Sequence, residues 1–564
     1  MTEEIKRSKV EIIKENSRQL RGHLAEELQQ PDQPFSEESE QLLKPHGIYQ
    51  QDDRDARKAK NPDGTPRGKQ YIFMVRSAVP GGKLTSAQLL AELDLCDRFG
   101  NGTLRITTRQ GLQLHGVIKR HLKATVRAIN EILLTTLAAC GDNRRNVMAC
   151  PAPLANDPVR AHLQQLCDQV AEHLKPRTTA YHEIWLTDDS GLSQNVADWQ
   201  PVDEPIYGKC YLPRKFKIGF ALPEDNCVDV LSHDLGFVAV REGDRLAGCN
   251  VVVGGSMGQT PSAEKTFVAL AQPLAFITPD QVVPVAEAIV KVQRDHGNRA
   301  DRKLARMKYL IHNWGLARFR ATVEEYYGRP LSPPQPLQIH HADDHLGWHE
   351  QGDGRWFVGI NVPNGRIADT PQAQYKTALR CLATRFPGRW RLTALQNILL
   401  CDVLPEHRPD VSSILADHGI TPAEHQTWLR RWAIACPALP TCGLAVTESE
   451  RAMPAVLDQL EQTLAQLGLG SLPIAVHMTG CPNGCARPYS SDIGFVGKTL
   501  GKYTIYVGGN PQGTRLAFIY KDMVPQADLV TAVQPLLEQF VQHRQPEELL
   551  GDFCQRVGRE HLKR

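Results

Sequence analysis

The chain has 564 residues, enough for three or four domains of ordinary size. Hydrophobic residues make up 41% and charged residues 23%, which is typical of globular proteins and excludes collagen, coiled-coil and disordered chains. The net charge of +2 gives no reason to expect a nucleic-acid partner. No apolar run reaches the roughly 18 residues of a membrane helix, and the first residues lack the apolar segment of a secretion signal. We therefore expect a cytoplasmic protein that binds neither membrane nor nucleic acid.

In chain order, residues 1–60 form a polar, charged extension. Beyond it, a strand leads through a glycine turn into an amphipathic helix at 85–99, and the same order is predicted before a helix at 377–386. The segment 297–315 is predicted to be a basic helix, and the prolines after it mark a linker near 330–340. This mixture of strands and helices indicates an α+β (mixed α/β) fold.

A cationic face is predicted in the first half of the chain. In LRITTRQGLQLH at 104–115, alternation places Arg105, Arg109 and His115 on one face of a strand, opposite a leucine-rich face. In LPRKFK, Lys215 and Lys217 share a face in the same way. Two further cations, Arg76 and Arg145, lie in strand or turn segments. These groups form either a solvated outer face of a sheet or an anion site.

Short motifs recur in the same order in the two halves of the chain. VPGGK at 79–83 corresponds to VPNGR at 362–366, LRITTRQGLQL to WRLTALQNILL, and ACPA at 149–152 to ACPA at 435–438. Two further pairs are DLGFVA at 234–239 with DIGFVG at 492–497, and VVGGSMGQT at 252–260 with VGGNPQGTR at 507–515. Five such pairs indicate a duplicated unit, with chance resemblance among glycine-rich turns as the alternative. The first copy has the cations of the 104–115 segment, and the second copy has the closely spaced cysteines. We therefore expect the two copies to meet at one redox site beside an anion-binding cavity.

Four of the 14 cysteines form two close pairs, Cys436 with Cys442 and Cys481 with Cys485. Four thiolates can hold an iron–sulfur cluster or a structural zinc ion. Zinc sites usually have shorter spacings than the C-x5-C of the first pair, and the prolines and glycines within both pairs favour bends that bring backbone amides to sulfur. Spacing alone therefore favours a cluster but leaves zinc and unrelated thiols open. The other ten cysteines are interpreted as small buried apolar residues.

The motifs TGCPNGCARP, ACPALPTC, HGIYQQDDRD, TLRITTRQGLQLHG, NRRNV, LPRKFK and WHEQGDG together resemble the assimilatory sulfite reductase hemoproteins of the sulfite/nitrite reductase superfamily. The resemblance extends from about residue 46 to residue 515. It implies a pseudo-twofold duplicated fold, with ferredoxin-like half-domains at 61–130 and 333–410 and sulfite reductase domains at 131–332 and 411–564. These four units surround a central siroheme and [4Fe–4S] cluster.

The same resemblance implies roles for individual residues. Cys436, Cys442, Cys481 and Cys485 would bind the cluster, and Cys485 would also be the axial ligand of the siroheme. Arg76, Arg145, Lys215 and Lys217 match substrate-binding cations. Arg105, Arg109 and His115 match positions around the siroheme.

The resemblance implies the six-electron reduction of sulfite to sulfide, in the assimilation of sulfate for cysteine biosynthesis. A nitrite reductase of the same fold is the alternative, although those enzymes typically have asparagine at the position of Lys217. An electron carrier stabilised by zinc or a cluster is an alternative of another class. Because no G-x-G-x-x-G stands in a nucleotide-binding context, we expect electrons from a partner protein. This donor would be ferredoxin or an NADPH-dependent flavoprotein subunit, and WHEQGDG, MKYLI and CARPY favour ferredoxin.

Overall fold

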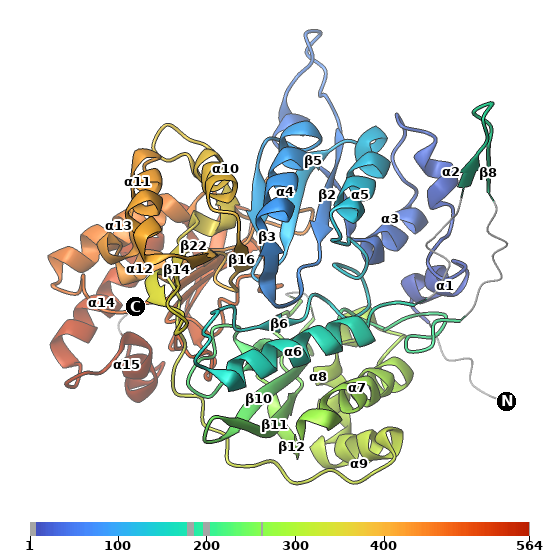
Figure 1. Ribbon diagram of the computed structural model, residues 1–564. Coiled ribbons are helices and arrows are strands. Elements are labelled where there is room, and N and C mark those ends of the chain that lie inside the picture. Colours follow the sequence, from blue (N-terminus) through green and yellow to red (C-terminus); the bar gives the residue numbers. More distant parts are fainter. Residues whose placement is uncertain (1–6, 178–184, 196–202, 261–262, 563–564) are drawn as a thin grey trace.

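The computed structural model describes residues 7–177, 185–195, 203–260 and 263–562. Four five-stranded sheets, together with a two-stranded hairpin, make up the sheet structure of this part of the chain. Helices cover the sheets on the outside, while the two copies of the repeat meet in the middle (Figure 1). The predicted α+β fold with duplicated half-domains is confirmed.

Two of the sheets exchange a short strand between the halves. The first exchange sheet has the order β1 (Ile48–Asp52), β2 (Tyr71–Ser77), β5 (Leu112–Val117), β4 (Leu104–Ile106) and β15 (Arg366–Ile367). The second exchange sheet has the order β13 (Gly347–Glu350), β14 (Trp356–Ile360), β17 (Ile398–Val403), β16 (Arg389–Leu392) and β3 (Lys83–Thr85). Each sheet therefore ends on a strand from the other half of the chain.

Tight glycine turns make the exchange possible. Gly82 and Gly365 precede β3 and β15 with φ of +72° and +74°, a conformation that side chains disfavour. A Cβ atom at Gly82 would lie 2.3 Å from the carbonyl oxygen of Leu392 in β16, and one at Gly365 would lie 2.3 Å from that of Ile106 in β4. Only glycine allows the two backbones to approach this closely, which explains the recurrence of VPGGK and VPNGR.

The exchange sheets share one hydrophobic core. Its helices are α4 (Ser86–Arg98), α5 (Leu122–Glu131), α10 (Tyr375–Arg385) and α11 (Arg408–Asp417). Thr85 caps α4 in a capping box with Gln88, and Leu89, Leu93 and Cys96 follow on one face of the helix and are buried. The helices α4 and α10 agree with the predictions at 85–99 and 377–386 within one to two residues at each end.

The other two sheets have the same strand order in each half. The first core sheet contains β6 (Met148–Ala149), β9 (Ile218–Ala221), β10 (Leu235–Glu242), β11 (Arg245–Val253) and β12 (Gln272–Ile277). The second core sheet contains β18 (Ile434–Ala435), β19 (Val476–Thr479), β20 (Ile493–Thr499), β21 (Lys502–Val507) and β22 (Phe518–Pro525). In each, the first three strands are parallel and the rest antiparallel. The carboxyl ends of β6 and β9, and of β18 and β19, therefore lie side by side.

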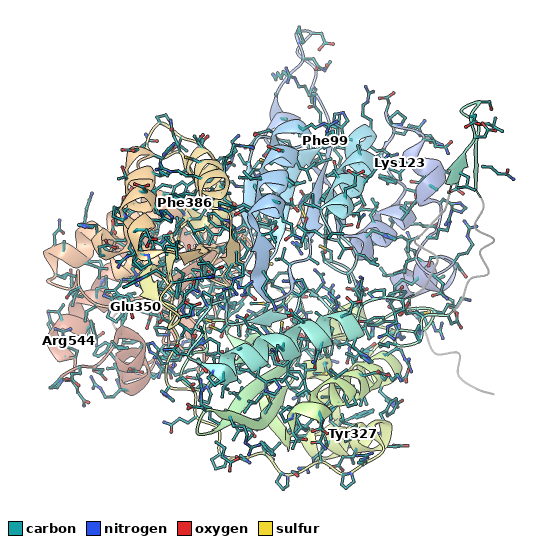
Figure 2. All side chains as sticks on the ribbon, viewed as in Figure 1. Phe99, Lys123, Tyr327, Glu350, Phe386 and Arg544 are labelled. Atoms are coloured by element: carbon teal, nitrogen blue, oxygen red, sulfur yellow. The ribbon has the colours of Figure 1, made fainter. Side chains whose placement is uncertain are left out.

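Helices and side chains fill the outer layer (Figure 2). Those packed with the first core sheet are α6 (Pro158–His173), α7 (Val282–His296), α8 (Met307–Trp314) and α9 (Leu316–Tyr327). Those packed with the second are α12 (Trp428–Arg431), α13 (Met453–Gln466), α14 (Leu529–His543) and α15 (Leu550–Val557). The N-terminal segment adds α1 (Lys9–Glu15), α2 (Leu24–Leu28) and α3 (Glu37–Leu43), and the hairpin consists of β7 (Trp185–Thr187) and β8 (Ser193–Asn195). None of the helices in the described ranges is both long and apolar enough to span a bilayer.

Two local predictions are wrong. The segment 104–115 is a hairpin rather than one strand, because Gln110 adopts a φ of +52° and the chain reverses between β4 and β5. Antiparallel pairing nevertheless sets Arg105 opposite Gln113, so both still lie on one face. The basic segment 297–315 is helical only from Met307, apart from a short turn at Arg302–Leu304, and Arg306 is an extended residue before the helix.

Candidate active site

Four cysteines gather at the carboxyl edge of the second core sheet. Cys436 directly follows β18, and Cys481 follows its parallel neighbour β19. Cys442 and Cys485 lie in the turns after them. The charge of each thiolate would act on the others, since the Cys485 thiol raises the pKa of Cys436, Cys442 and Cys481. The two sequence pairs therefore form one group.

Backbone and side-chain amides point at these sulfur atoms. The Gly480 N–H donates to Cys436 Sγ at 3.3 Å, and the Asn483 side-chain amide donates to Cys481 Sγ at 3.5 Å. The backbone N–H groups of Leu444 and Ala445 hydrogen-bond to the Cys442 thiol. Amides directed at sulfur are the contacts that tune an iron–sulfur cluster.

Burial sets the charge state of the bare thiols. Burial, with the Cys485 thiol close by, raises the pKa of Cys481 to about 11, and burial raises that of Cys436 further. Four thiolates whose charges act on one another would need bound positive charge, which the irons of a cluster provide. The donor set of four sulfurs with amide contacts fits a [4Fe–4S] cluster.

A wall of cations from the first half faces Cys485. Lys215 and Lys217 come just before β9, and Arg306 comes just before α8. The Cys485 thiol is exposed on the other side, and its charge acts on all three cations. Thr108 Oγ1 donates to the Cys485 carbonyl oxygen at 3.0 Å, which ties the two halves together here. The structure therefore brings together residues that stand about half the chain apart.

This wall has an excess of positive charge. Burial, with Arg306 and Arg109 nearby, lowers the pKa of Lys217 to about 7, and burial beside Arg306 and Arg214 lowers that of Lys215 further. Within the described part of the chain, neither lysine Nζ has a hydrogen-bond or ion-pair partner. Asp234 is the nearby acid, and its carboxylate accepts from the Lys217 backbone N–H at 2.9 Å. Buried cations without partners favour an anionic ligand.

The predicted arginines continue this wall. Arg109 lies in the turn after β4, where Nη2 donates to the Asn146 carbonyl at 2.6 Å, and burial beside Arg145 lowers its pKa to about 9. Arg145 Nε donates to the Gly141 carbonyl at 2.9 Å, and its side chain also bonds to the Tyr49 hydroxyl. Arg76 is half-buried on β2, with its guanidinium on the amide oxygen of Gln113.

Arg105 and His115 differ from the other predicted cations. Arg105 is fully engaged with protein groups: Nε pairs with Glu450 at 2.9 Å, and Nη2 donates to the Ala435 carbonyl at 2.8 Å. It thereby anchors β4 beside the cysteine group. His115 is buried, and neither ring nitrogen has a partner among the described residues. Burial, with Arg366 and Arg105 nearby, holds its pKa well below the usual range, so the ring is neutral.

Sequence reasoning missed three cations of the site. Arg306 is buried, with Nη1 on Ser256 Oγ at 2.8 Å. Arg214 precedes Lys215, and burial beside Arg306 lowers its pKa to about 9. Arg487, two residues after Cys485, pairs with Asp229 at 2.8 Å. Arg214 and Arg487 lie inside quoted motifs and could have been found there, whereas only the tertiary structure brings Arg306 to the site.

A polyanionic tetrapyrrole fits this surface. Among the described residues, the wall combines two lysines without ion-pair partners, Lys215 and Lys217, with unpartnered buried atoms, namely both nitrogens of His115, Nε of Arg109 and Nδ1 of His233. Carboxylates of a siroheme would neutralise the former and accept hydrogen bonds from the protonated nitrogens among the latter. The exposed Cys485 sulfur lies opposite these cations and would bind the siroheme iron.

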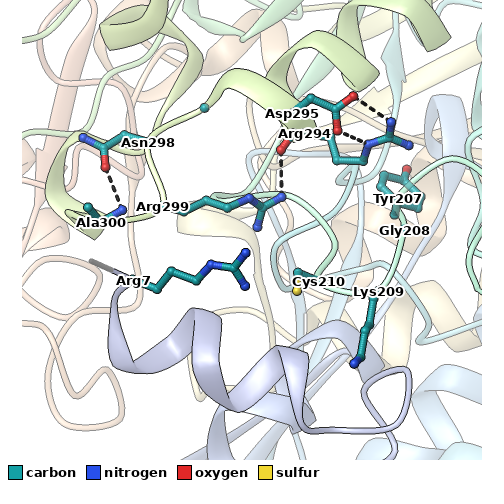
Figure 3. A pocket seen from close by; sticks show the side chains of 11 residues that line it. Arg7, Tyr207, Gly208, Lys209, Cys210, Arg294, Asp295, Asn298, Arg299 and Ala300 are labelled. Carbon is teal, nitrogen blue, oxygen red and sulfur yellow. Dashed lines mark hydrogen bonds and ion pairs between the residues drawn. The ribbon is translucent and has the colours of Figure 1, made fainter. Parts of the chain in front are cut away.

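A separate cavity of about 800 Å³ lies beside α1 (Figure 3). None of the predicted site residues lines it. Its arginines already have partners: Arg7 pairs with Glu15, Arg294 with Asp295, and Arg299 with Glu11. The arginines of the cavity therefore offer little free charge to a ligand, and the remaining lining cation, Lys209, is exposed to solvent.

Comparison with known proteins identifies the class. The family model of the nitrite and sulphite reductase 4Fe-4S domain matches residues 168–331 and 430–564. The nitrite/sulfite reductase ferredoxin-like half domain matches 66–132 and 349–418. The chain therefore belongs to the nitrite and sulphite reductase family, in agreement with the resemblance.

Individual relatives are similar over nearly the whole chain. The sulfite reductase [ferredoxin] of Synechococcus elongatus is 43% identical over 99% of this chain and 90% of its own. The sulfite reductase [NADPH] hemoprotein beta-component of Geobacillus kaustophilus is 44% identical, over 98% and 96%. Among solved structures, the Mycobacterium tuberculosis NirA protein shares the fold, with a TM-score of 0.77 at 23% identity over 97% and 96% of the two chains.

Proposed function

We propose that this chain is the hemoprotein of an assimilatory sulfite reductase, which reduces sulfite to sulfide with six electrons. One observation carries the proposal: the exposed Cys485 sulfur of the second half faces Lys215 and Lys217 of the first half, whose Nζ atoms have no partner among the described residues. A thiolate group beside an anion site is the arrangement that electron transfer to a small oxyanion requires. The names of the relatives at 42–44% identity support sulfite as the substrate.

The residues that would hold the cofactors follow from their surroundings. Cys436, Cys442, Cys481 and Cys485 would bind a [4Fe–4S] cluster, with Cys485 shared with a siroheme iron. Arg109 and His115 would contact the siroheme periphery, and Arg105 would position β4 through its Glu450 pair. When bound, these cofactors supply low-potential electrons and an iron that binds the sulfur atom of sulfite.

The side chains of this chain supply position, charge and protons. Arg76 and Arg145 bind and polarise the oxyanion, because a guanidinium keeps its proton. Lys215 and Lys217 can both hold an oxygen and release a proton at Nζ, and the pKa of about 7 at Lys217 suits proton transfer near neutral pH. The backbone contact of Lys217 with Asp234 fixes the direction of this segment. Each oxygen that leaves sulfite as water needs two protons, and the lysines would deliver them.

The residue at position 217 distinguishes sulfite from nitrite as the expected substrate. Lys217 provides a charge that the asparagine typical of the nitrite enzymes would not. Steady-state kinetics on both anions would test the assignment, and we expect kcat/KM to be larger for sulfite. A much larger value for nitrite would overturn it.

The electron donor is a separate partner protein, and we propose ferredoxin. The WHEQGDG, MKYLI and CARPY motifs support this choice, while relatives named for ferredoxin and for NADPH are about equally similar. Turnover should be supported by reduced ferredoxin and not by NADPH with a sulfite reductase flavoprotein. The reverse result would assign the flavoprotein as donor.

Replacing Cys485 by serine tests the shared ligand. We expect Cys485→Ser to disturb the absorption spectrum of the siroheme and the iron and acid-labile sulfide content together, because one sulfur would serve both cofactors. Cys381→Ser, at a half-buried cysteine on α10, is the matched control and should change neither. If Cys485→Ser altered only one cofactor, the shared role would be wrong.

A further inference from the structure

A second group of potential metal ligands lies in the first half of the chain. Cys150, Asp225, Cys227 and His345 are all buried, and one donor atom from each lies within 4.8 Å of the others. They are distinct from the four cysteines described above. Of the isolated cysteines, interpreted as small apolar residues, Cys150 and Cys227 therefore stand in a polar environment.

The group lies in the first half at the position equivalent to that of the cysteine group in the second half. Cys150 directly follows β6, and Asp225 and Cys227 follow β9, its parallel neighbour. In the second half, Cys436 directly follows β18 and Cys481 follows β19 in the same arrangement. The buried group therefore occupies, in the first copy, the sheet edge that holds the cysteine group in the second. Its fourth member, His345, comes from the linker just before β13.

The contacts among the four side chains are close. Cys150 Sγ lies 2.9 Å from Asp225 Oδ2 and 3.3 Å from His345 Nε2, and His345 Nε2 lies 3.2 Å from the same carboxylate oxygen. The other carboxylate oxygen is fixed by the backbone N–H groups of Cys227 and Asp343, at 3.1 and 3.2 Å.

Residues around the four donors hold them in place, as the residues that hydrogen-bond to the ligands of a metal site do. The far ring nitrogen of His345, Nδ1, faces Asp343 Oδ2 at 3.9 Å, so Nε2 is the nitrogen directed into the group. The Arg160 guanidinium touches Cys150 Sγ and pairs with Asp225 at 2.7 Å.

We propose that Cys150, Asp225, Cys227 and His345 bind one structural zinc ion. Two thiolates, an imidazole and a carboxylate form a donor set that suits tetrahedral zinc, whose bonds of roughly 2.0–2.3 Å separate its ligands by about 3.3–3.8 Å. The separations among Cys150, Asp225 and His345, from 2.9 to 3.3 Å, lie at or just below the short end of that range, and Cys227 Sγ completes the set within 4.8 Å. All four positions would be filled by protein, and the donors are buried, so this site has no open position for catalysis.

The charges of the buried group balance with zinc present. Two thiolates and one carboxylate carry three negative charges, and a zinc ion with Arg160 carries three positive ones. An uncompensated charge at this depth would be costly. Because His345 belongs to the linker, the ion would tie the connection between the two halves to the first core sheet. The proposal is independent of the proposed reaction.

Element analysis of the holoenzyme tests the site. The fully iron-loaded protein is incubated with zinc sulfate, desalted and measured for zinc and iron. We expect about one zinc per chain in the wild type. Cys227→Ser and His345→Gln should each lose at least about tenfold in retained zinc, because one of four ligands is gone. Their iron content should stay unchanged. Cys249→Ser, at a buried cysteine of β11 outside the group, is the matched control and should keep its zinc.

X-ray absorption at the zinc edge of the wild type makes the test independent of variant folding. Two sulfurs at about 2.3 Å and two nitrogen or oxygen atoms at about 2.0–2.1 Å are expected. A four-sulfur shell would mean that zinc had entered the cluster cysteines and would overturn the proposal. Absence of retained zinc would also overturn it, leaving Arg160, Asp225, Cys150 and His345 as a metal-free ion network. Undiminished zinc in well-folded variants would do the same.

Discussion

Individual cations predicted for the site have different roles because their protein partners differ. Arg105 and Lys217 were both expected at the site from alternation and resemblance. Arg105 meets Glu450, so its charge is used in joining the two halves. The Nζ atom of Lys217 has no hydrogen-bond or ion-pair partner among the described residues, although the charge of the nearby Asp234 acts on it. The charge of Lys217 therefore remains available to a ligand. The partner, and not the residue type, decides which cation can act on a substrate.

Replacing Lys217 by asparagine tests this availability. We expect Lys217→Asn to keep both cofactors, as judged by the absorption spectrum and iron content, and to lower kcat/KM for sulfite about 100-fold. The loss reflects one missing charged donor at the reacting anion. Lys123→Gln, at an exposed lysine of α5, is the control and should retain full activity. Full sulfite turnover in Lys217→Asn would refute the role of Lys217.

At the scale of elements, helix α4 combines a regular apolar face with one buried acid. Glu92 lies between Leu89 and Leu93 on the inner face, where it accepts from Ser77 Oγ while its other oxygen has no partner among the described residues. Burial raises the pKa of Glu92 to about 7. A carboxyl group with a raised pKa keeps its proton in the folded chain up to a higher pH than a carboxyl group in the unfolded chain does. The fold therefore loses stability as pH rises from the pKa of the unfolded chain, about 4.3, toward 7.

This acid predicts a pH-dependent effect of Glu92→Gln. At pH 8 the buried carboxylate costs roughly 4 kcal/mol, from about 1.4 kcal/mol per pKa unit, whereas at pH 5 the cost is small in comparison. The variant should therefore gain thermal stability relative to wild type at pH 8 and gain less at pH 5. Thermal unfolding at both pH values measures the change in Tm between the variant and the wild type. Glu38→Gln, on the exposed side of α3, is the control. An equal change in Tm at both pH values would contradict the raised pKa.

At the scale of the whole molecule, strand exchange makes the two halves interdependent. β3 and β15 complete sheets of the opposite half, and the exchange sheets share one core with α4 and α10. The cysteine group and the cationic wall come from different halves, so the geometry of the site depends on this exchange. We therefore expect a mutation at an exchange turn to affect the stability of the entire chain.

Two glycines with similar backbone conformation distinguish the cost of the close backbone approach at the exchange turn from the cost of local backbone strain. Gly82→Ala would press a methyl group onto the Leu392 backbone, whereas Gly102→Ala, with φ of +78°, meets no atom within 4 Å. Gly102→Ala should cost about 1–2 kcal/mol, the strain of the conformation alone. Gly82→Ala should cost at least about 3 kcal/mol, because backbone must shift as well. Thermal unfolding measures both, and equal losses would show that the close approach does not matter.

Local patterns explain which parts of the fold and site could be predicted. The helices at α4 and α10 follow from apolar spacing, and the glycine turns follow from VPGGK and VPNGR, because these signals are short-range. The hairpin at β4 and β5 was missed, since alternation continues through the turn at Gln110. Arg306 was missed because, although it stands directly before MKYLI, it lies far along the chain from LPRKFK and TGCPNGCARP, the motifs of the site. Cys150 and Cys227 were interpreted as apolar for the same reason: Asp225 and His345 reach them only in the folded chain.

By itself, the sequence determined the class of protein, the duplication, the two cysteine pairs and most of the cations, because each depends on residue type and spacing along the chain. Only the tertiary structure decided which cations remain free, that β3 and β15 change sheets, and that a second set of donors meets at the ends of β6 and β9. Such properties depend on distances between residues hundreds of positions apart. Those distances are set by the packing of the two copies against each other.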